Sequence, residues 1–189
     1  MYTSNKKTGK NIFSLSFDDT ILLFKDIYEN NYKSIFQNQT LNWFQESHKK
    51  YGVVISCYVY YENDDFNLSR FPSKYKKQFE ENSDWLRFGF HTLNSKTDYR
   101  KGEIKNDYIK TVNQLERIVG DKSIDNVIRL QMFQGSKNNI KELVQYSNQP
   151  IKGLLTADDN RQSYYLSKNN NSFIYCHDEL YDSSMNLFF

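Results

Sequence analysis

The sequence has few of the residues that break or cross-link a chain. Among 189 residues it contains two prolines, Pro72 and Pro150, and two cysteines, Cys57 and Cys176. Two isolated cysteines do not make a disulfide framework, which favours a reduced, cytoplasmic protein, although a secreted protein without its leader would look the same. No Gly/Ser-rich linker and no internal repeat divides the chain. We therefore expect one domain over residues 1–189.

Long apolar runs and an excess of one charge are also missing. The first residues, MYTSNKKTGKN, lack the apolar segment of a secretory signal, and no stretch approaches the roughly 20 apolar residues of a membrane span. The 25 basic and 23 acidic residues give a net charge of only +2. Nucleic-acid or membrane binding usually requires a larger basic excess or a basic stripe, so neither partner is expected.

Strand-like and helix-like segments alternate along the chain. The apolar run Val53–Tyr61 is the strongest strand, and Gly52 before it suits the end of a helix. The other expected strands are Ile12–Phe17, Leu86–His91, Val127–Phe133, Gly153–Thr156 and a candidate at Tyr164–Leu166; the expected helices are Leu41–Tyr51, Ser73–Ser83, Tyr108–Val119 and Ile140–Tyr146. This alternation predicts an α/β fold of parallel βαβ units, in a barrel or an open sheet. The apolar terminus Asn186–Phe189 either tucks into that sheet or marks a chain cut short.

Polar side chains lie at the ends of four of these strands. We expect Asn11–Thr20 to be a buried strand that delivers Asp18 and Asp19 to the edge of the sheet. The ends of later strands carry His91, Arg129–Gln131 and Asp158–Asp159. Because functional groups gather at the carboxyl ends of parallel strands, these residues predict one site.

Three segments resemble motifs of a known family. SLSFDDT (Ser14–Thr20), WLRFGFHTLNS (Trp85–Ser95) and RLQMFQGSKNNI (Arg129–Ile140) are similar, in order and rough spacing, to the three leading motifs of polysaccharide deacetylases, carbohydrate esterase family four. The resemblance covers the chain from Phe13 to about Ile140. It implies a (β/α) barrel of the polysaccharide-deacetylase type, distorted or incomplete at its C-terminus. It also implies a metal-dependent hydrolase that removes N- or O-acetyl groups from a carbohydrate.

The resemblance also implies roles for individual residues. Asp18 would be the catalytic base, with Arg129 to orient and tune it, and Asp19 and His91 would hold a divalent metal, expected to be Zn²⁺. From the chemistry of their side chains, and not from the resemblance, two further residues are expected to bind substrate. They are Gln131, which stands where the family usually has proline and whose amide suits hydrogen bonds, and Phe133, whose ring could stack on a sugar.

The chain departs from the family pattern at several positions. Ser95 stands where the family has its second metal-binding histidine, Thr20 replaces a glycine, and the late Leu-x-His motif has no clear match. Candidates to replace the missing ligand are Asn94, Asp98, Asp158 and Asp159. Two alternatives therefore stay open: an inactive relative that binds a glycan or small molecule, and a metal-independent hydrolase in which Asp18 works alone. The loop Glu62–Asn67 is rich in oxygen ligands but lacks the Gly and closing Glu of a calcium loop.

Overall fold

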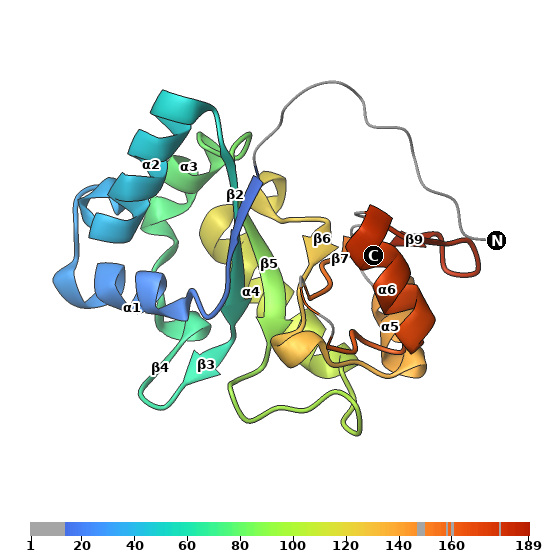
Figure 1. The fold of residues 1–189 in the computed structure, drawn as a ribbon. Coiled ribbons are helices and arrows are strands. Elements are labelled where there is room, and N and C mark those ends of the chain that lie inside the picture. Colours follow the sequence, from blue (N-terminus) through green and yellow to red (C-terminus); the bar gives the residue numbers. More distant parts are fainter. Residues whose placement is uncertain (1–13, 147–149, 158, 160, 178) are drawn as a thin grey trace.

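In this computed structural model, a three-stranded parallel sheet forms the first half of the fold (Figure 1). The structure describes residues 14–146, 150–157, 159, 161–177 and 179–189. Strands β1 (Ser14–Phe17), β2 (Val54–Tyr60) and β5 (Leu86–Thr92) lie in the order β1-β2-β5. The predictions of the second and third strands are confirmed. Both are apolar runs buried on two faces, as a parallel sheet requires.

The second half contains a mixed four-stranded sheet. Its order is β6-β7-β9-β8, and only the β8–β9 pair is antiparallel. The strands are β6 (Val127–Ile128), β7 (Gly153–Leu154), β8 (Tyr181–Asp182) and β9 (Leu187–Phe188). An isolated parallel bridge pairs Phe88 of β5 with Ile124, which precedes β6 in the chain. The chain terminus therefore does tuck into a sheet, through β9.

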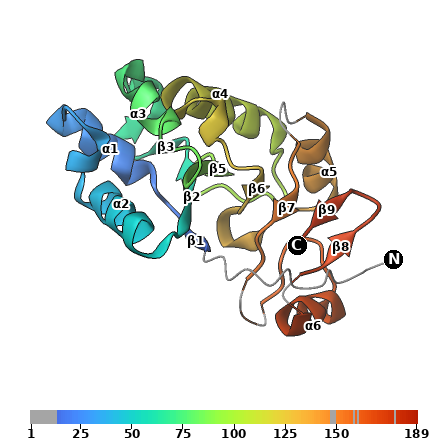
Figure 2. The same cartoon turned by 90° about the horizontal axis from the view of Figure 1, so that it is seen from above.

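Helices flank both sheets, and a small hairpin follows β2. Figures 1 and 2 show α1, α2 and α3 on the side of β1 and β2, and α5 and α6 beside the second sheet. The helices are α1 (Ile21–Asn30), α2 (Gln39–Tyr51), α3 (Lys76–Glu80), α4 (Lys105–Val119), α5 (Lys137–Tyr146) and α6 (Lys168–His177); the hairpin is β3 (Glu62–Asn63) and β4 (Phe66–Asn67). Short 3₁₀ turns span Ile35–Gln37, Leu68–Arg70, Ser73–Tyr75, Asp121–Ser123 and Gln131–Phe133.

Helix α2 shows how local sequence sets an element's limits. The side chain of Asn38 accepts a hydrogen bond from the Leu41 amide at 2.9 Å and caps the first turn. At the other end, Gly52 adopts a left-handed φ of 68° and donates its N–H to the His48 carbonyl. The helix and its glycine cap are thus confirmed. In the described part of the chain, no helix is both long and apolar enough to cross a membrane.

Two hydrophobic clusters fill the fold, and β5 contributes to both. Phe88 packs in the first cluster against Phe24 and Phe79, with ring centroids 5.5 and 5.3 Å apart. Phe90, on the same face of the strand, belongs to the second cluster and meets the ring of Tyr108 edge-on. The opposite face of the sheet carries polar and aromatic residues that lead to the strand ends. In sequence order these are Ser16, Ser56, Tyr58, Tyr60, Arg87 and His91, with Gly89 between the last two.

The predicted barrel is wrong. The described strands form separate sheets of three, two and four strands and do not close. The expected strand Val127–Phe133 pairs only over Val127–Ile128, and its last residues form a 3₁₀ turn with positive φ at Met132 and Phe133. Two-residue strands make few ladder hydrogen bonds, and an antiparallel strand, β8, occupies the far edge. Among the described strands, none is therefore presented there in parallel to pair with β1.

Smaller expectations also fail. Strand β1 is an edge strand rather than a buried one, since Ser14 is exposed and Leu15 is 37% exposed; residues 11–13 lie outside the described part. Tyr164–Leu166 is a turn, not a strand. Helices α1 and α6 are not among the helices that the sequence predicts. The expectation of a single domain stays a prediction.

Candidate active site at the strand ends

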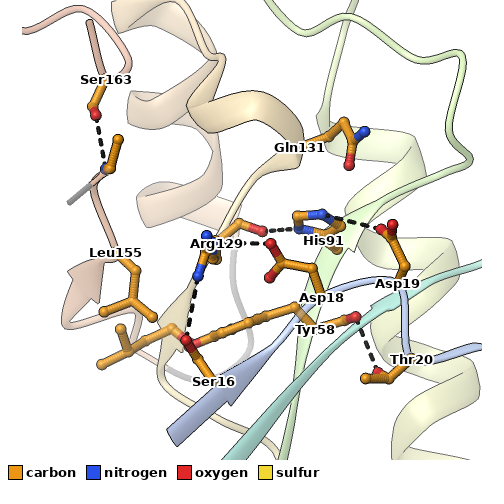
Figure 3. A network of polar contacts seen from close by, with 12 residues as sticks. Ser16, Asp18, Asp19, Thr20, Tyr58, His91, Arg129, Gln131, Leu155 and Ser163 are labelled. Atoms are coloured by element: carbon orange, nitrogen blue, oxygen red, sulfur yellow. Dashed lines mark hydrogen bonds and ion pairs between the residues drawn. The ribbon is translucent and has the colours of Figure 1, made fainter. Parts of the chain in front are cut away.

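The chain turns sharply after β1 and separates the two aspartates. Asp19 has a left-handed φ of 57°, a conformation that aspartate tolerates better than most residues. Thr20 anchors the turn, because its N–H and its hydroxyl both donate to the Tyr58 carbonyl, at 3.1 and 3.0 Å. Figure 3 shows the result: Asp18 and Asp19 point to different partners.

Asp18 forms an ion pair with Arg129. Arg129 Nε lies 3.1 Å from Asp18 Oδ2, and both side chains are partly buried. The guanidinium is itself held, since its Nη1 donates to the Ser16 hydroxyl at 3.3 Å and its carbon lies 4.6 Å from the centre of the Phe133 ring. A carboxylate that faces a fixed guanidinium has a defined orientation. The predicted pairing of Asp18 with Arg129 is present.

Asp19 faces His91 instead. Asp19 Oδ1 is 3.5 Å from His91 Nε2, and the imidazole is buried whereas the carboxylate is largely exposed. His91 Nδ1 contacts the backbone carbonyl of Arg129. Because a carbonyl can only accept, Nδ1 carries the hydrogen, and Nε2 is the nitrogen directed at Asp19. This is the orientation in which a neutral histidine presents its lone pair to a ligand.

Tyr60 completes the cluster, although its place in an apolar strand predicts core packing. Its ring stacks on His91 with centroids 5.4 Å apart, and its hydroxyl donates to Gln131 Oε1 at 2.8 Å. Burial, together with the nearby negative charge of Asp19, raises the pKa of Tyr60 above its usual range. The hydroxyl therefore remains a hydrogen-bond donor. Its position at the end of β2, between the ends of β1 and β5, is the sequence signal that could have identified it.

Phe133, the other residue predicted to bind substrate, is more buried than stacking on a sugar would require. Phe133 is 6% exposed, and the cations of Arg129 and Arg161 lie 4.6 and 5.8 Å from its ring centre. Little of the ring is open to a sugar. Its contacts hold the Arg129 guanidinium, while stacking on substrate stays a prediction.

The candidates for a third metal ligand do not join the cluster. Asp98 pairs with Arg100 at 2.6 Å, and hydrogen bonds from Arg100 lower the pKa of Asp98 to about 2. Asp159 pairs with Arg161 in the same way, and the Asn94 amide donates to Glu62. Ser95 is exposed, and Asp158 lies outside the described residues. Within the described ranges, no group of three His, Cys, Asp or Glu residues could hold a metal ion.

Asp19 and His91 nevertheless suit two positions around one cation. Zinc binds carboxylate oxygen and imidazole nitrogen at about 2.0–2.2 Å, so two tetrahedral ligands lie about 3.3 Å apart. The observed separation of 3.5 Å is close to this value. The donor set therefore fits a divalent ion held by two protein ligands, with the other positions left for water or substrate.

Comparisons with known proteins identify no family for this chain. No family model, curated protein or solved structure matches this chain.

Proposed function

We propose that this site hydrolyses acetyl groups, N- or O-linked, on a carbohydrate, with a divalent metal as cofactor. One observation carries the proposal: the two carboxylates after β1 have separate partners, Arg129 for Asp18 and His91 for Asp19. Separate partners allow a division of labour between a general base and a metal ligand. The resemblance of the surrounding motifs to polysaccharide deacetylases supports the same assignment.

Asp18 is the residue placed to take a proton. Its side chain is 33% exposed, so water can reach the carboxylate, while Arg129 holds the other side of it. A base must come within about 2.6–3.2 Å of the proton donor, and a fixed carboxylate meets that requirement more often than a mobile one. Ser16 and Phe133, which hold Arg129, then act as positioning residues.

Asp19 and His91 would hold the metal. A bound divalent ion acidifies its water and polarises the carbonyl that is attacked. The Arg129 carbonyl fixes the His91 ring, and Tyr60 covers its face. We expect two protein ligands to bind Zn²⁺ more weakly than the usual three. Tyr60 and Gln131 supply a hydroxyl and an amide for hydrogen bonds to substrate.

Acetate release tests the proposal. Purified protein is incubated with acetylated xylo- and chito-oligosaccharides, with Zn²⁺, Co²⁺, Mn²⁺ or Mg²⁺, and with a chelator. We expect metal-dependent release, and Asp18→Asn should slow it by about 10²–10⁴-fold because the general base is lost. Asp159→Asn is the matched control, since that carboxylate also pairs with an arginine but in an exposed turn. Its rate should be unchanged, and absence of acetate with every metal would refute the proposal.

A second function is a non-catalytic relative that binds a carbohydrate or small molecule. It is favoured by Ser95 at the expected ligand position and by the absence of a three-ligand group among the described residues. In that case sugars bind without acetate release, and Asp18→Asn leaves the rate of acetate release at background. Release that persists in the chelator would instead support the metal-independent hydrolase.

A cytoplasmic location stays a proposal, compatible with the buried free thiol of Cys57.

A further inference from the structure

The candidate metal ligand His91 lies at an irregularity of β5. Val59 of β2 pairs with Phe90 of β5 in the regular way. The next residue of β2, Tyr60, pairs with Thr92, so β5 has one extra residue at this point, His91. Such a bulge interrupts the ladder and redirects the side chain of the extra residue. The direction of the imidazole therefore depends on its side-chain contacts as well as on the strand.

The imidazole can serve as a ligand in one orientation only. Its Nδ1 donates to the Arg129 carbonyl, and its Nε2 lies 3.5 Å from Asp19 Oδ1. Rotation of the ring by half a turn about its Cβ–Cγ bond would exchange each nitrogen with a carbon. The hydrogen bond to Arg129 would then be lost, and no lone pair would be directed at the position shared with Asp19.

Tyr60 covers one face of this imidazole. The two rings are stacked, with centroids 5.4 Å apart and planes 15° apart, and the residues are only 5% and 2% exposed. Side chains in a close-packed interior leave little free volume for a ring to turn. An imidazole that rotated about Cβ–Cγ would have to displace the tyrosine ring. The stack therefore opposes the rotation that would disable His91.

Gln131 in turn holds Tyr60. The Tyr60 hydroxyl donates to Gln131 Oε1 at 2.8 Å. Gln131 belongs to the same segment after β6 as Arg129, whose carbonyl contacts His91 directly. The contacts thus form a closed ring, from His91 to Arg129, along the chain to Gln131, and through Tyr60 back to His91. Networks in which every group has its partner restrict the movement of each member.

We propose that Tyr60 is a positioning residue for the metal ligand His91: its ring keeps the imidazole from rotating, and Gln131 holds the tyrosine in place. The inference rests on the proposed function only in taking Asp19 and His91 as metal ligands. Groups that orient a metal-binding histidine typically contribute about 10–100-fold to metal affinity. With two ligands in the described cluster, the orientation of each has a large effect.

Titration with Co²⁺, in the absence of any acetylated substrate, tests the proposal. Visible absorption of the bound ion reports on its ligands, and the titration gives the affinity. We expect Tyr60→Leu, which removes the ring, to weaken Co²⁺ binding about tenfold or more. The matched control is Tyr61→Leu, because Tyr61 is also buried but its ring is covered by Lys110 Nζ at 3.8 Å. The control should change the affinity less than twofold.

Two outcomes of this titration would overturn the inference. They are equal losses of affinity in Tyr60→Leu and Tyr61→Leu, and the absence of Co²⁺ binding by the unaltered protein. The midpoint of thermal unfolding is measured for both variants. A purely structural role would lower this midpoint in both and leave the affinity of the folded protein for Co²⁺ unchanged.

Two milder variants test the link to Gln131 and serve if Tyr60→Leu does not fold. Tyr60→Phe keeps the stacked ring and loses the hydroxyl, and Gln131→Met loses the acceptor at similar size. We expect each to weaken Co²⁺ binding about threefold. The double variant should weaken it no further, because all three remove the same hydrogen bond. Additive losses would contradict the role assigned to Gln131.

The orientation of the imidazole is also measurable in the metal-free protein. NMR of ¹⁵N-labelled histidine shows which ring nitrogen carries the hydrogen, and His91→Gln assigns the signal among the three histidines. We expect one set of signals with the hydrogen on Nδ1 in the unaltered protein, and a broadened or second set in Tyr60→Leu. Unchanged signals in Tyr60→Leu would overturn the inference.

These measurements separate the inference from the proposed function, since none of them uses a substrate. Co²⁺ binding that depends on Tyr60, without acetate release under any condition, would refute only the proposed enzyme. Acetate release by a protein whose Co²⁺ affinity is independent of Tyr60 would refute only the positioning role.

Discussion

The two main sheets differ in strand length. In the first sheet, β2 and β5 have seven residues each, whereas every strand of the second sheet has two. The second half also places non-glycine residues at positive φ, among them Met132, Phe133, Tyr164 and Asn186. Such residues cost conformational energy and persist only where their surroundings fix them. The strands of the first sheet are therefore determined largely by their own sequences. Those of the second sheet depend more on packing against residues distant in the chain.

The candidate site lies where these two regions meet. Asp18, Asp19 and His91 come from strand ends of the first sheet, while Arg129 and Gln131 come from the irregular segment after β6. The contact between the Arg129 carbonyl and His91 joins the two. The strands of the first sheet thus position the two carboxylates and the imidazole. The irregular segment after β6 brings the guanidinium of Arg129 to them.

The largest effect is expected in the core of the first region. Phe88 is 1% exposed and packs against two other phenylalanine rings, so Phe88→Ala should lower the free energy of unfolding by about 3–5 kcal/mol. Urea denaturation followed by fluorescence measures it. A loss below about 1 kcal/mol would show that this cluster is not the dominant core.

A smaller loss is expected at Gly89, where the sheet approaches the site. A Cβ there would lie 2.8 and 2.9 Å from carbons of the buried Tyr58 ring. Gly89→Ala should cost about 1–3 kcal/mol through overpacking, visible as a lower midpoint of thermal unfolding. The matched control is Gly102→Ala, where the nearest atom is a backbone oxygen at 3.2 Å in an exposed turn. An equal loss in both would mean that contact with the Tyr58 ring is not the cause of the destabilisation.

Hydrogen exchange compares the regions directly. Backbone amides of β2 and β5 should exchange last, and those of β6, β7 and β9 at least about tenfold faster, because short ladders open locally. Mass spectrometry of peptides from the two sheets measures the rates. Equal protection would show that both sheets unfold only together.

The smallest effect concerns the strained segment itself. Met132 is 56% exposed and has a φ of 52°, so Met132→Gly should relieve the left-handed strain. We expect the free energy of unfolding to rise by up to about 1 kcal/mol, measured by urea denaturation, since little packing is lost. A decrease would mean that the methionine side chain contributes packing that its exposure does not reveal.

The elements that the sequence predicted correctly share a clear signal. The segment Val53–Tyr61 is an unbroken apolar run, and Leu41–Tyr51 ends at a glycine with the expected backbone conformation. The second half gave weaker signals: only two residues of Val127–Phe133 pair as a strand, and α6 was missed. Short strands have no periodicity long enough to detect, because neighbours distant in sequence fix them.

For the site, the sequence by itself determined that Asp18, Asp19 and His91 stand at the ends of strands, since strand limits follow from local apolar patterns. The family resemblance implied that Arg129 serves Asp18 and that Asp19 and His91 act together; only the tertiary structure decided the contacts through which these residues meet and added Tyr60 to them. It also decided that the sheets stay open, against the predicted barrel. These outcomes depend on pairing and packing between residues far apart in the chain, which no local pattern encodes.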